Sequence, residues 1–196
     1  MTGPTKKAAA RRAEILAAAS LCFSEKGIKD AKIDDICARM NISPGHLYYY
    51  FKSKSEILDV LIDAYTDNIA KMGDALIERE NALDHFLYED FVSPQLDDGD
   101  NESYIWDVYT QMRNDPHLAE KGRRHWQVSS EALRKIVLSA KRHGRLREDT
   151  DVETVVTLLS MMVLTAQFAE MADPNYDLER YQAALRLALK PFLTAP

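Results

Sequence analysis

Apolar residues recur at helical spacing along most of the chain, and no segment shows the strict alternation of apolar and polar residues expected for a half-buried strand. Glycines, prolines and polar capping residues divide this pattern into segments of helical length. The segments predicted to be helical cover about 7–26, 33–39, 44–50, 53–75, 79–91, 104–113, 118–143, 151–171 and 178–192. The chain is therefore predicted to be all-α, with about nine to ten helices.

The boundaries of the longer segments come from glycines and from one polar stretch. Gly27 and Gly144 are predicted to end helices, because glycine readily takes the left-handed backbone that closes a helix. Thr150 or Asp151 is expected to cap the helix that begins near residue 151. The acidic stretch 93–103 contains proline and glycine, so we expect a loop there, and the most mobile segment of the chain.

The stretch 33–54 is predicted to form two short helices joined by a tight turn, followed by the start of a third helix. Asn41 tolerates the left-handed backbone that follows a helix. Ser43 followed by Pro44 is typical of a helix N-terminus, with serine as the cap and proline in the first turn. Ser53, with Glu56 three residues later, has the pattern of a second capped start.

The second short helix, 44–50, is too aromatic on its outer face to be ordinary core. If Leu47 and Phe51 point inward, the residues left facing outward are Gly45, His46, Tyr48 and Tyr49. In a helix–turn–helix, the second helix enters the major groove of DNA, where such side chains reach base edges and phosphates. The pattern predicts a DNA-binding N-terminal part.

The charge of the chain is distributed unevenly. Its 196 residues carry a formal net charge of −6, which alone argues against a nucleic-acid-binding protein. Residues 1–54, however, contain ten Lys and Arg against five Asp and Glu, so this part carries +5 and the remainder −11. A basic end on an acidic body is expected when only one end of a protein meets phosphate.

Residues Arg11 to Leu58 resemble the N-terminal domain of TetR-family transcriptional regulators. The matching features are Ile15-Leu16, Ala18-Ala19, Phe23, Gly27, Ile33, Ile36, the run Ile42 to Phe51, and Ser53-Lys54 leading into Ile57-Leu58. The resemblance implies a three-helix helix–turn–helix domain over 1–54 and a helical effector-binding and dimerisation domain over 55–196. It also implies a homodimeric repressor that binds an inverted-repeat operator in double-stranded DNA and is released by a small molecule.

The resemblance assigns roles to residues of the second short helix and its surroundings. His46 stands where relatives aim a small polar side chain at the bases, and Tyr48 and Tyr49 are expected to reach phosphates and a thymine methyl. Lys54 matches a lysine at a helix N-terminus that holds a phosphate. The expected DNA-contacting residues are Lys32, Pro44, Gly45, His46, Tyr48, Tyr49, Lys52 and Lys54.

Further residues around the two short helices are also assigned roles. Tyr50 is expected to pack against the first helix, with a DNA contact as the alternative. Many relatives carry threonine near position 31 as a cap and phosphate ligand, whereas this chain has Ala31-Lys32. We therefore expect Asp30 to cap the helix instead and Lys32 to bind the phosphate. Lys6, Lys7, Arg11 and Arg12 are expected to add nonspecific attraction to DNA.

The C-terminal half is similar to the C-terminal domain of BetI-like members of the family. The similarity rests on Trp106, Asp115-Pro116, Trp126 and the run Gly144 to Arg147 followed by Asp149 and Asp151. It implies a dimer interface built from two long helices of each subunit, to which it assigns Ala132, Leu133, Ile136, Val137, Val155, Val156, Leu159, Met162 and Val163. The alternative is that these faces belong to the chain's own core and that the dimer uses other faces.

An effector pocket is expected between the middle helices, where aromatic and sulfur-containing side chains are plentiful. The candidate lining residues are Tyr65, Asn68, Met72, Phe86, Tyr104, Trp106, Tyr109, Met112, Trp126, Gln127, Met161, Thr165 and Phe168. Taken singly, each of them is more typical of a core residue than of a ligand contact. The composition favours an apolar or amphipathic effector, and Asp107 and Glu89 beside aromatic residues would suit a cationic one.

An enzyme is not expected. The five histidines lack the spacing of metal ligands, the seven glycines form no phosphate-binding loop, and no Ser/His/Asp signature is present. We therefore expect no cofactor and no metal. The N-terminus lacks the hydrophobic core of a signal peptide, and polar residues interrupt the apolar run 154–171, so a cytoplasmic protein without a membrane span is expected.

Two other functions remain open from the sequence. A transcriptional activator of the same family would use the same DNA-binding head. A helical, dimeric protein-interaction module would not need the outward face formed by His46, Tyr48 and Tyr49, and its binding to DNA would lack sequence preference.

Overall fold

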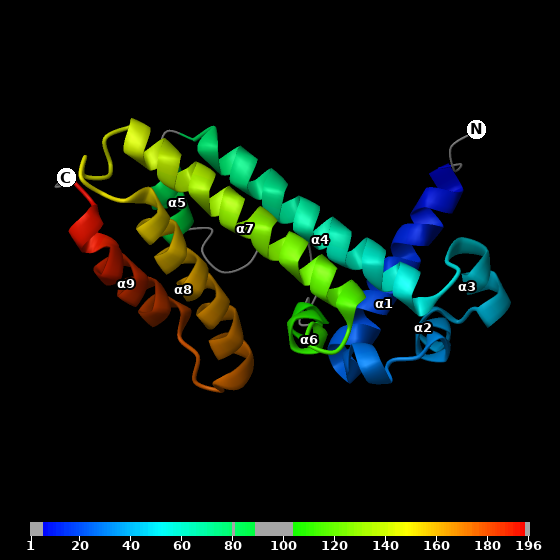
Figure 1. Cartoon of the computed structure of the whole chain (residues 1–196). Helices are drawn as coiled ribbons and strands as arrows, with labels where there is room; N and C mark the ends of the chain where they lie inside the picture. The colour runs from blue at the N-terminus through cyan, green and yellow to red at the C-terminus, as the bar shows by residue number, and fades with distance from the viewer. Residues whose placement is uncertain (1–5, 80, 89–103, 195–196) are drawn as a thin grey trace. The chain divides into compact units, whose positions relative to one another are not determined.

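The computed structural model describes residues 6–79, 81–88 and 104–194 (Figure 1). In these residues the protein is all-α, as predicted, with one isolated antiparallel bridge between Leu146 and Leu193. The helices are α1 (Lys6–Asp30), α2 (Ile33–Met40), α3 (Pro44–Tyr50), α4 (Lys54–Ile77), α5 (Ala82–Tyr88), α6 (Tyr104–Gln111), α7 (Pro116–Arg142), α8 (Val152–Ala172) and α9 (Leu178–Leu189), followed by the 3₁₀ turn η1 (Lys190–Phe192). Across the described ranges, no helix is both long and apolar enough to cross a membrane.

Several helix boundaries differ from the prediction for local reasons. Gly27 leaves the helical conformation (φ 80°, ψ 154°), but the chain resumes a helical turn and α1 ends at Asp30. The start of α7 lies at Pro116, earlier than predicted, because the Asp115 carboxylate accepts hydrogen bonds from the next two free backbone N–H groups, those of His117 and Leu118 (2.9 and 3.1 Å).

Two other predicted segments also differ from the helices in the structure. The segment predicted over 79–91 corresponds to α5, which begins at Ala82, whereas its last part and the loop predicted over 93–103 lie outside the described residues. The segment predicted over 178–192 is α-helical to Leu189 and ends in the 3₁₀ turn, where Pro191 removes a backbone donor.

The described residues form two compact units, and each has its own core. The first contains the described residues within Met1–Tyr65 and Leu96–His125. In it α1 packs against α2 and α6, and α2 packs against α3. Its fully buried large side chains include Phe23, Phe51, Ile15, Ile36, Leu47, Ile57 and Ile62. Because these come from all of α1 to α4, burial of apolar surface fixes α3 relative to its neighbours.

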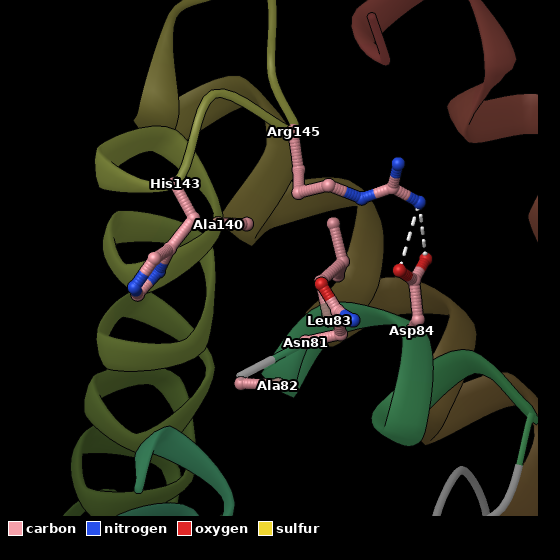
Figure 2. Close-up of a pocket in the computed structure, with 7 residues that line it drawn as sticks. All are labelled: Asn81, Ala82, Leu83, Asp84, Ala140, His143 and Arg145. Carbon is pink, nitrogen blue, oxygen red and sulfur yellow. Dashed lines mark hydrogen bonds and ion pairs between the residues drawn. The ribbon is translucent and has the colours of Figure 1, made fainter. Parts of the chain in front are cut away.

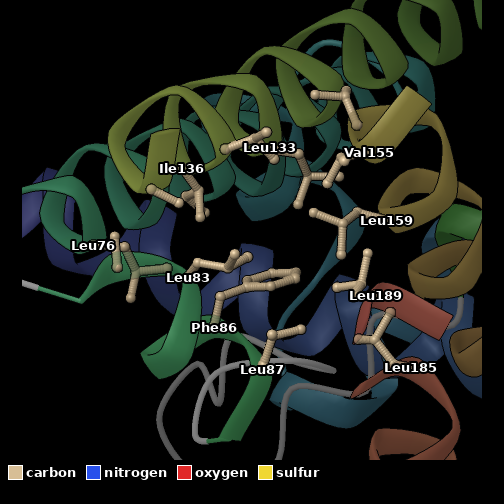
Figure 3. Packing of buried hydrophobic residues seen from close by; sticks show 14 of the residues in the cluster. Leu76, Leu83, Phe86, Leu87, Leu133, Ile136, Val155, Leu159, Leu185 and Leu189 are labelled. Atoms are coloured by element: carbon tan, nitrogen blue, oxygen red, sulfur yellow. The ribbon is translucent and has the colours of Figure 1, made fainter. Parts of the chain in front are cut away.

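The second unit contains the described residues within Thr66–Gln95 and Trp126–Pro196. Its core is one apolar cluster (Figure 3), whose labelled members are Leu76, Leu83, Phe86, Leu87, Leu133, Ile136, Val155, Leu159, Leu185 and Leu189. In this unit α8 packs against α9, and α9 packs against α5. The predicted division of the chain into 1–54 and 55–196 is one of function, and it stays a prediction.

Candidate nucleic-acid interface

The turn between α2 and α3 has the geometry that the sequence predicts. Asn41 is left-handed (φ 51°, ψ 49°) and its backbone N–H donates to the Ala38 carbonyl, while the N–H of Ile42 donates to the Cys37 carbonyl (3.2 and 3.0 Å). Ser43 then caps α3, because its hydroxyl accepts the N–H of His46 (3.3 Å). A left-handed residue, a serine cap and a proline therefore turn the chain sharply into α3.

Helix α3 has one buried side and one exposed side. Leu47 and Phe51 are 0 and 1% exposed. On the opposite side Tyr48 is 51% and Tyr49 81% exposed, and His46 is exposed beside them. Large aromatic side chains are rarely left in water without a partner, so this face has the character of a binding surface.

The exposed face also carries a row of three rings. The His46 imidazole stacks on the Tyr50 ring, with centroids 5.6 Å apart and an interplanar angle of 21°. The Tyr49 ring meets Tyr50 edge-on at 5.0 Å and 86°. Tyr50, which was predicted to pack against the first helix, is half-buried and lies in this row.

Arg12 of α1 ties the C-terminal end of α3 to the rest of the unit. Its guanidinium donates a hydrogen bond to the backbone carbonyl of Tyr50 and lies 4.0 Å from the centre of the Phe51 ring. A cation at the carbonyl end of a helix is favourable, and its contact with an aromatic face adds to this. The sequence suggested only nonspecific attraction to DNA for Arg12, since nothing local connects it with α3.

Lys54, expected to bind a phosphate, is engaged inside the unit. Its ammonium donates to the backbone carbonyls of Ile28, Ala31 and Lys29, at 2.6, 2.8 and 3.3 Å. Burial lowers its pKa, although Asp30 acts in the opposite direction. The side chain therefore closes the end of α1 in this structure, and its contact with phosphate stays a prediction.

Lys32 and Lys52 are exposed, so both are positioned for solvent or phosphate. The expected cap at Asp30 is wrong: the N-cap residue of α2 is Lys32. Its backbone N–H donates to the Asp35 carboxylate (2.8 Å), and the side chain of Asp35 also binds Lys26 (2.5 Å), which together with this backbone contact lowers the pKa of Asp35. A carboxylate in the first turn replaces the missing side-chain cap.

The candidate effector residues divide between the two units. Tyr65, Tyr104, Trp106, Tyr109 and Met112 belong to the first unit, and the others to the second. In the first unit His125, which the sequence did not single out, stacks on Tyr65 (5.1 Å, 27°) and meets Tyr109 edge-on (6.0 Å). Burial lowers the pKa of His125 to about 4 and raises that of Tyr109 to about 12.

In the second unit most candidate effector residues do not line an enclosed space. Phe86 lies in the apolar core, whereas Trp126, Gln127, Met161, Thr165 and Phe168 are exposed. A shallow recess between α5 and the end of α7 is lined by other residues, among them Arg145 and Asp84, which face each other (Figure 2). One guanidinium nitrogen of Arg145 donates to both carboxylate oxygens of Asp84, at 2.9 and 2.8 Å.

The carboxylate suggested for a cationic effector is also occupied. Asp107 of α6 accepts the backbone N–H of Ile28, just after the break at Gly27, at 2.6 Å. A Cβ atom built on Gly27 would lie 3.0 Å from the same carboxylate. Asp107 therefore serves as a partner of α1, and Glu89, named with it, lies outside the described residues.

The residues predicted to form the dimer interface lie in the core of the single chain, and their role in a dimer stays a prediction. Ala132, Leu133, Ile136, Val137, Val155, Val156 and Leu159 are 0–7% exposed within the single chain, and Met162 and Val163 pack against the same core. Side chains that already fill the chain's own core are not available to a second subunit. The alternative interpretation, that these faces are intrachain core, agrees with the structure.

Comparisons with known proteins agree with this architecture. Residues 15–61 match the family described as bacterial regulatory proteins of the tetR family, and residues 91–179 match the tetracyclin repressor-like C-terminal domain. The HTH-type transcriptional regulator UidR of Escherichia coli K12 is 26% identical over 188 residues, covering 94% of this chain and 93% of UidR.

Two solved structures share the fold over nearly their whole length. A TetR transcription regulator from Haloarcula marismortui superposes with a TM-score of 0.79 at 20% identity, covering 95% of this chain and 100% of that one. A transcriptional regulator from Saccharomonospora viridis, solved in complex with choline, superposes with a TM-score of 0.77 at 16% identity and the same coverage. The specific BetI-like character of the C-terminal half has no counterpart among these matches.

Proposed function

Because the chain belongs to the TetR family of bacterial transcriptional regulators, we propose that it is a ligand-responsive repressor. In this proposal a homodimer binds an inverted-repeat operator, and a small-molecule effector releases it. The observation that carries the proposal is the exposed face of α3, where His46, Tyr48 and Tyr49 stand outward while Leu47 and Phe51 anchor the helix in the core.

The roles proposed for the DNA-facing residues follow from their exposure. His46 reads a base edge, Tyr48 and Tyr49 contact phosphates and a thymine methyl, and Lys52 and Lys32 bind phosphate. Gly45 has nothing within 4 Å of the position of an added Cβ, so the space beside it is open for the DNA backbone. Pro44 fixes the first turn of the same helix.

The test is a selection of tight-binding sequences from randomised duplexes, followed by fluorescence anisotropy on the selected duplex and on random DNA. We expect an inverted repeat whose half-sites lie about one helical turn apart. His46→Ala should weaken binding to the selected duplex by about 1–3 kcal/mol and leave random DNA unaffected, whereas Lys52→Ala should weaken both equally. Enrichment of no sequence would favour the protein-interaction module instead.

We propose that exposed apolar side chains of α8 and α9 form the dimer interface. Met161 and Phe168 on α8 are 57 and 52% exposed, and Leu187 on α9 is 71% exposed. A helix that is apolar on its outer as well as its inner side needs a second partner, and a second copy of the chain provides it. Phe168→Glu with Leu187→Glu should give a folded monomer in sedimentation velocity, whereas Lys71→Glu, an exposed position on α4, should leave the dimer intact.

The effector proposed is an apolar or amphipathic small molecule. The aromatic side chains Tyr65, Trp106 and Tyr109 of the first unit support this chemistry. The Saccharomonospora relative binds choline, so a quaternary ammonium compound is a first compound to try. Release follows if the effector binds the DNA-free conformation more tightly than the DNA-bound one. Equal effector affinity for free and operator-bound protein would exclude this coupling, and operator-dependent activation of transcription in vitro would favour an activator.

A further inference from the structure

We propose that Tyr50 is a positioning residue for sequence recognition: its ring holds the His46 imidazole in the orientation that reads the operator. The inference rests on the proposed function at one point, the reading of a base by His46. Tyr50 itself need not touch DNA in this proposal. Its contribution is made before DNA binds, by restricting an exposed side chain on the recognition helix.

The contact follows from helix geometry. His46 and Tyr50 are four residues apart on α3, the spacing at which side chains of a helix are neighbours. Their rings are nearly parallel, at 5.6 Å and 21°, and Tyr49 meets the Tyr50 ring edge-on at 5.0 Å and 86°. Offset-stacked and edge-to-face pairs are the favourable arrangements of aromatic rings. Tyr50 is therefore the central ring of the row, in contact with both flanking rings.

The residue that carries the central ring is held to the unit through its backbone and by partial burial. Tyr50 is half-buried, and its backbone carbonyl accepts a hydrogen bond from Arg12. The same guanidinium covers the ring of Phe51 at 4.0 Å, and Phe51 is 1% exposed. His46 is exposed and has the freedom of a surface side chain, whereas Tyr50 is half-buried and directly precedes the buried Phe51. In this proposal the less exposed residue orients the exposed one.

The size of the effect follows from the freedom that His46 would otherwise lose on binding. Ordering a free side chain at an interface weakens binding by about 3- to 10-fold. A side chain that is already ordered in the free protein avoids most of that loss. Removal of the Tyr50 ring should therefore reduce the preference for the base pair read by His46 by about 3- to 10-fold.

The experiment compares the full-length wild type with Tyr50→Phe, Tyr50→Leu, His46→Ala and the double variant His46→Ala/Tyr50→Leu. Phenylalanine keeps the ring and removes the hydroxyl, whereas leucine removes the ring. In the DNA-free proteins, NMR measures the ring-current shift of the His46 imidazole protons and its cross-relaxation with the Tyr50 ring. Sequence preference is measured by selection from randomised duplexes, and circular dichroism and thermal melting report on folding.

We expect the His46 protons to be shifted upfield in the wild type and in Tyr50→Phe, and to lose that shift in Tyr50→Leu. The preference should fall in Tyr50→Leu at the same base pairs as in His46→Ala, and remain in Tyr50→Phe. The double variant should be no less selective than His46→Ala alone. The cross-relaxation in the wild type tests the contact even if Tyr50→Leu does not fold.

Several results would overturn the proposal. Equal losses in Tyr50→Phe and Tyr50→Leu would mean that the hydroxyl binds DNA directly. Equal weakening on selected and random duplexes, or no ring-current shift in the wild type, would remove the positioning role. If the wild type selects no sequence, the proposed function itself fails. If it selects one but His46→Ala leaves the preference unchanged, sequence-specific binding stands and the positioning role fails together with base reading by His46.

Discussion

Replacement of His125 by phenylalanine should flatten the pH dependence of folding stability. The imidazole is 8% exposed and lies against Tyr65 and Tyr109. Burial disfavours its charged form, so its pKa falls from the ordinary 6.5 to about 4. Phenylalanine keeps a ring of similar shape between the two tyrosines and has no proton to bind.

The magnitude and the sign follow from proton linkage. At pH 7 the imidazole is neutral in the folded chain and mostly neutral in the unfolded chain, so it contributes little pH dependence there. Between pH 6.5 and 4 the unfolded chain binds a proton that the folded chain does not. The free energy of unfolding therefore decreases as the pH is lowered through this range. At about 1.4 kcal/mol for each pH unit, the loss amounts to about 3 kcal/mol over the whole range and about 2 kcal/mol between pH 7 and pH 5.

The assay is urea unfolding of both proteins at pH 7, 6 and 5, at one protein concentration. The quantity compared is the difference in the free energy of unfolding between wild type and His125→Phe at each pH. Carboxylates with lowered pKa values, such as those of Asp35 and Asp151, also destabilise the fold on acidification, but they are common to both proteins and cancel. Parallel curves over this range would refute the reasoning, because they would mean that His125 is hydrated in the folded protein.

Three further substitutions test other contacts. Lys54→Met should lower the free energy of unfolding by about 1–2 kcal/mol in urea, because it leaves the carbonyls at the end of α1 without their charged donor, and Lys52→Met should change it little. Gly73→Ala should destabilise the protein by about 1–3 kcal/mol in thermal melts, because the new methyl would lie 2.7 Å from the Cβ of Ala132; unchanged melting would contradict this packing. The methyl of Gly45→Ala would meet open space in the free protein, so the free energy of unfolding should stay the same or rise by up to about 1 kcal/mol. Fluorescence anisotropy should show weaker binding to every duplex if the DNA backbone approaches this residue closely.

Helix α3 and its exposed face could be predicted from the sequence, because the residues that determine them are close together along the chain. The left-handed Asn41, the Ser43 cap and the inward pair of Leu47 and Phe51 each involve residues at most a few positions apart. Such patterns act through the same backbone geometry in any fold. The predicted start, end and exposed face of α3 were confirmed for this reason.

The remaining features depend on residues that are distant in the sequence. Arg12 meets Tyr50 across 38 positions, and Lys54 meets Ile28 across 26. No periodicity marks such partners in advance. The residues predicted to form the dimer interface are buried within the single chain. Apolar spacing shows that a side of a helix is buried, but it does not distinguish the chain's own core from a second subunit.

The break at Gly27 links two positions that the sequence keeps far apart. A side chain at residue 27 would have to adopt a left-handed backbone and would meet the carboxylate of Asp107. Loss of that carboxylate, in turn, would remove the acceptor of the Ile28 N–H that the break leaves outside the helix. A change at residue 27 is therefore costly whatever stands at position 107, and loss of the Asp107 carboxylate is costly as long as the break at Gly27 remains. Close homologues that keep the break at Gly27 should therefore keep an acceptor at position 107, and a chimaera that exchanges α6 with that of a relative lacking this carboxylate should fold well only if residues 26–30 are exchanged with it.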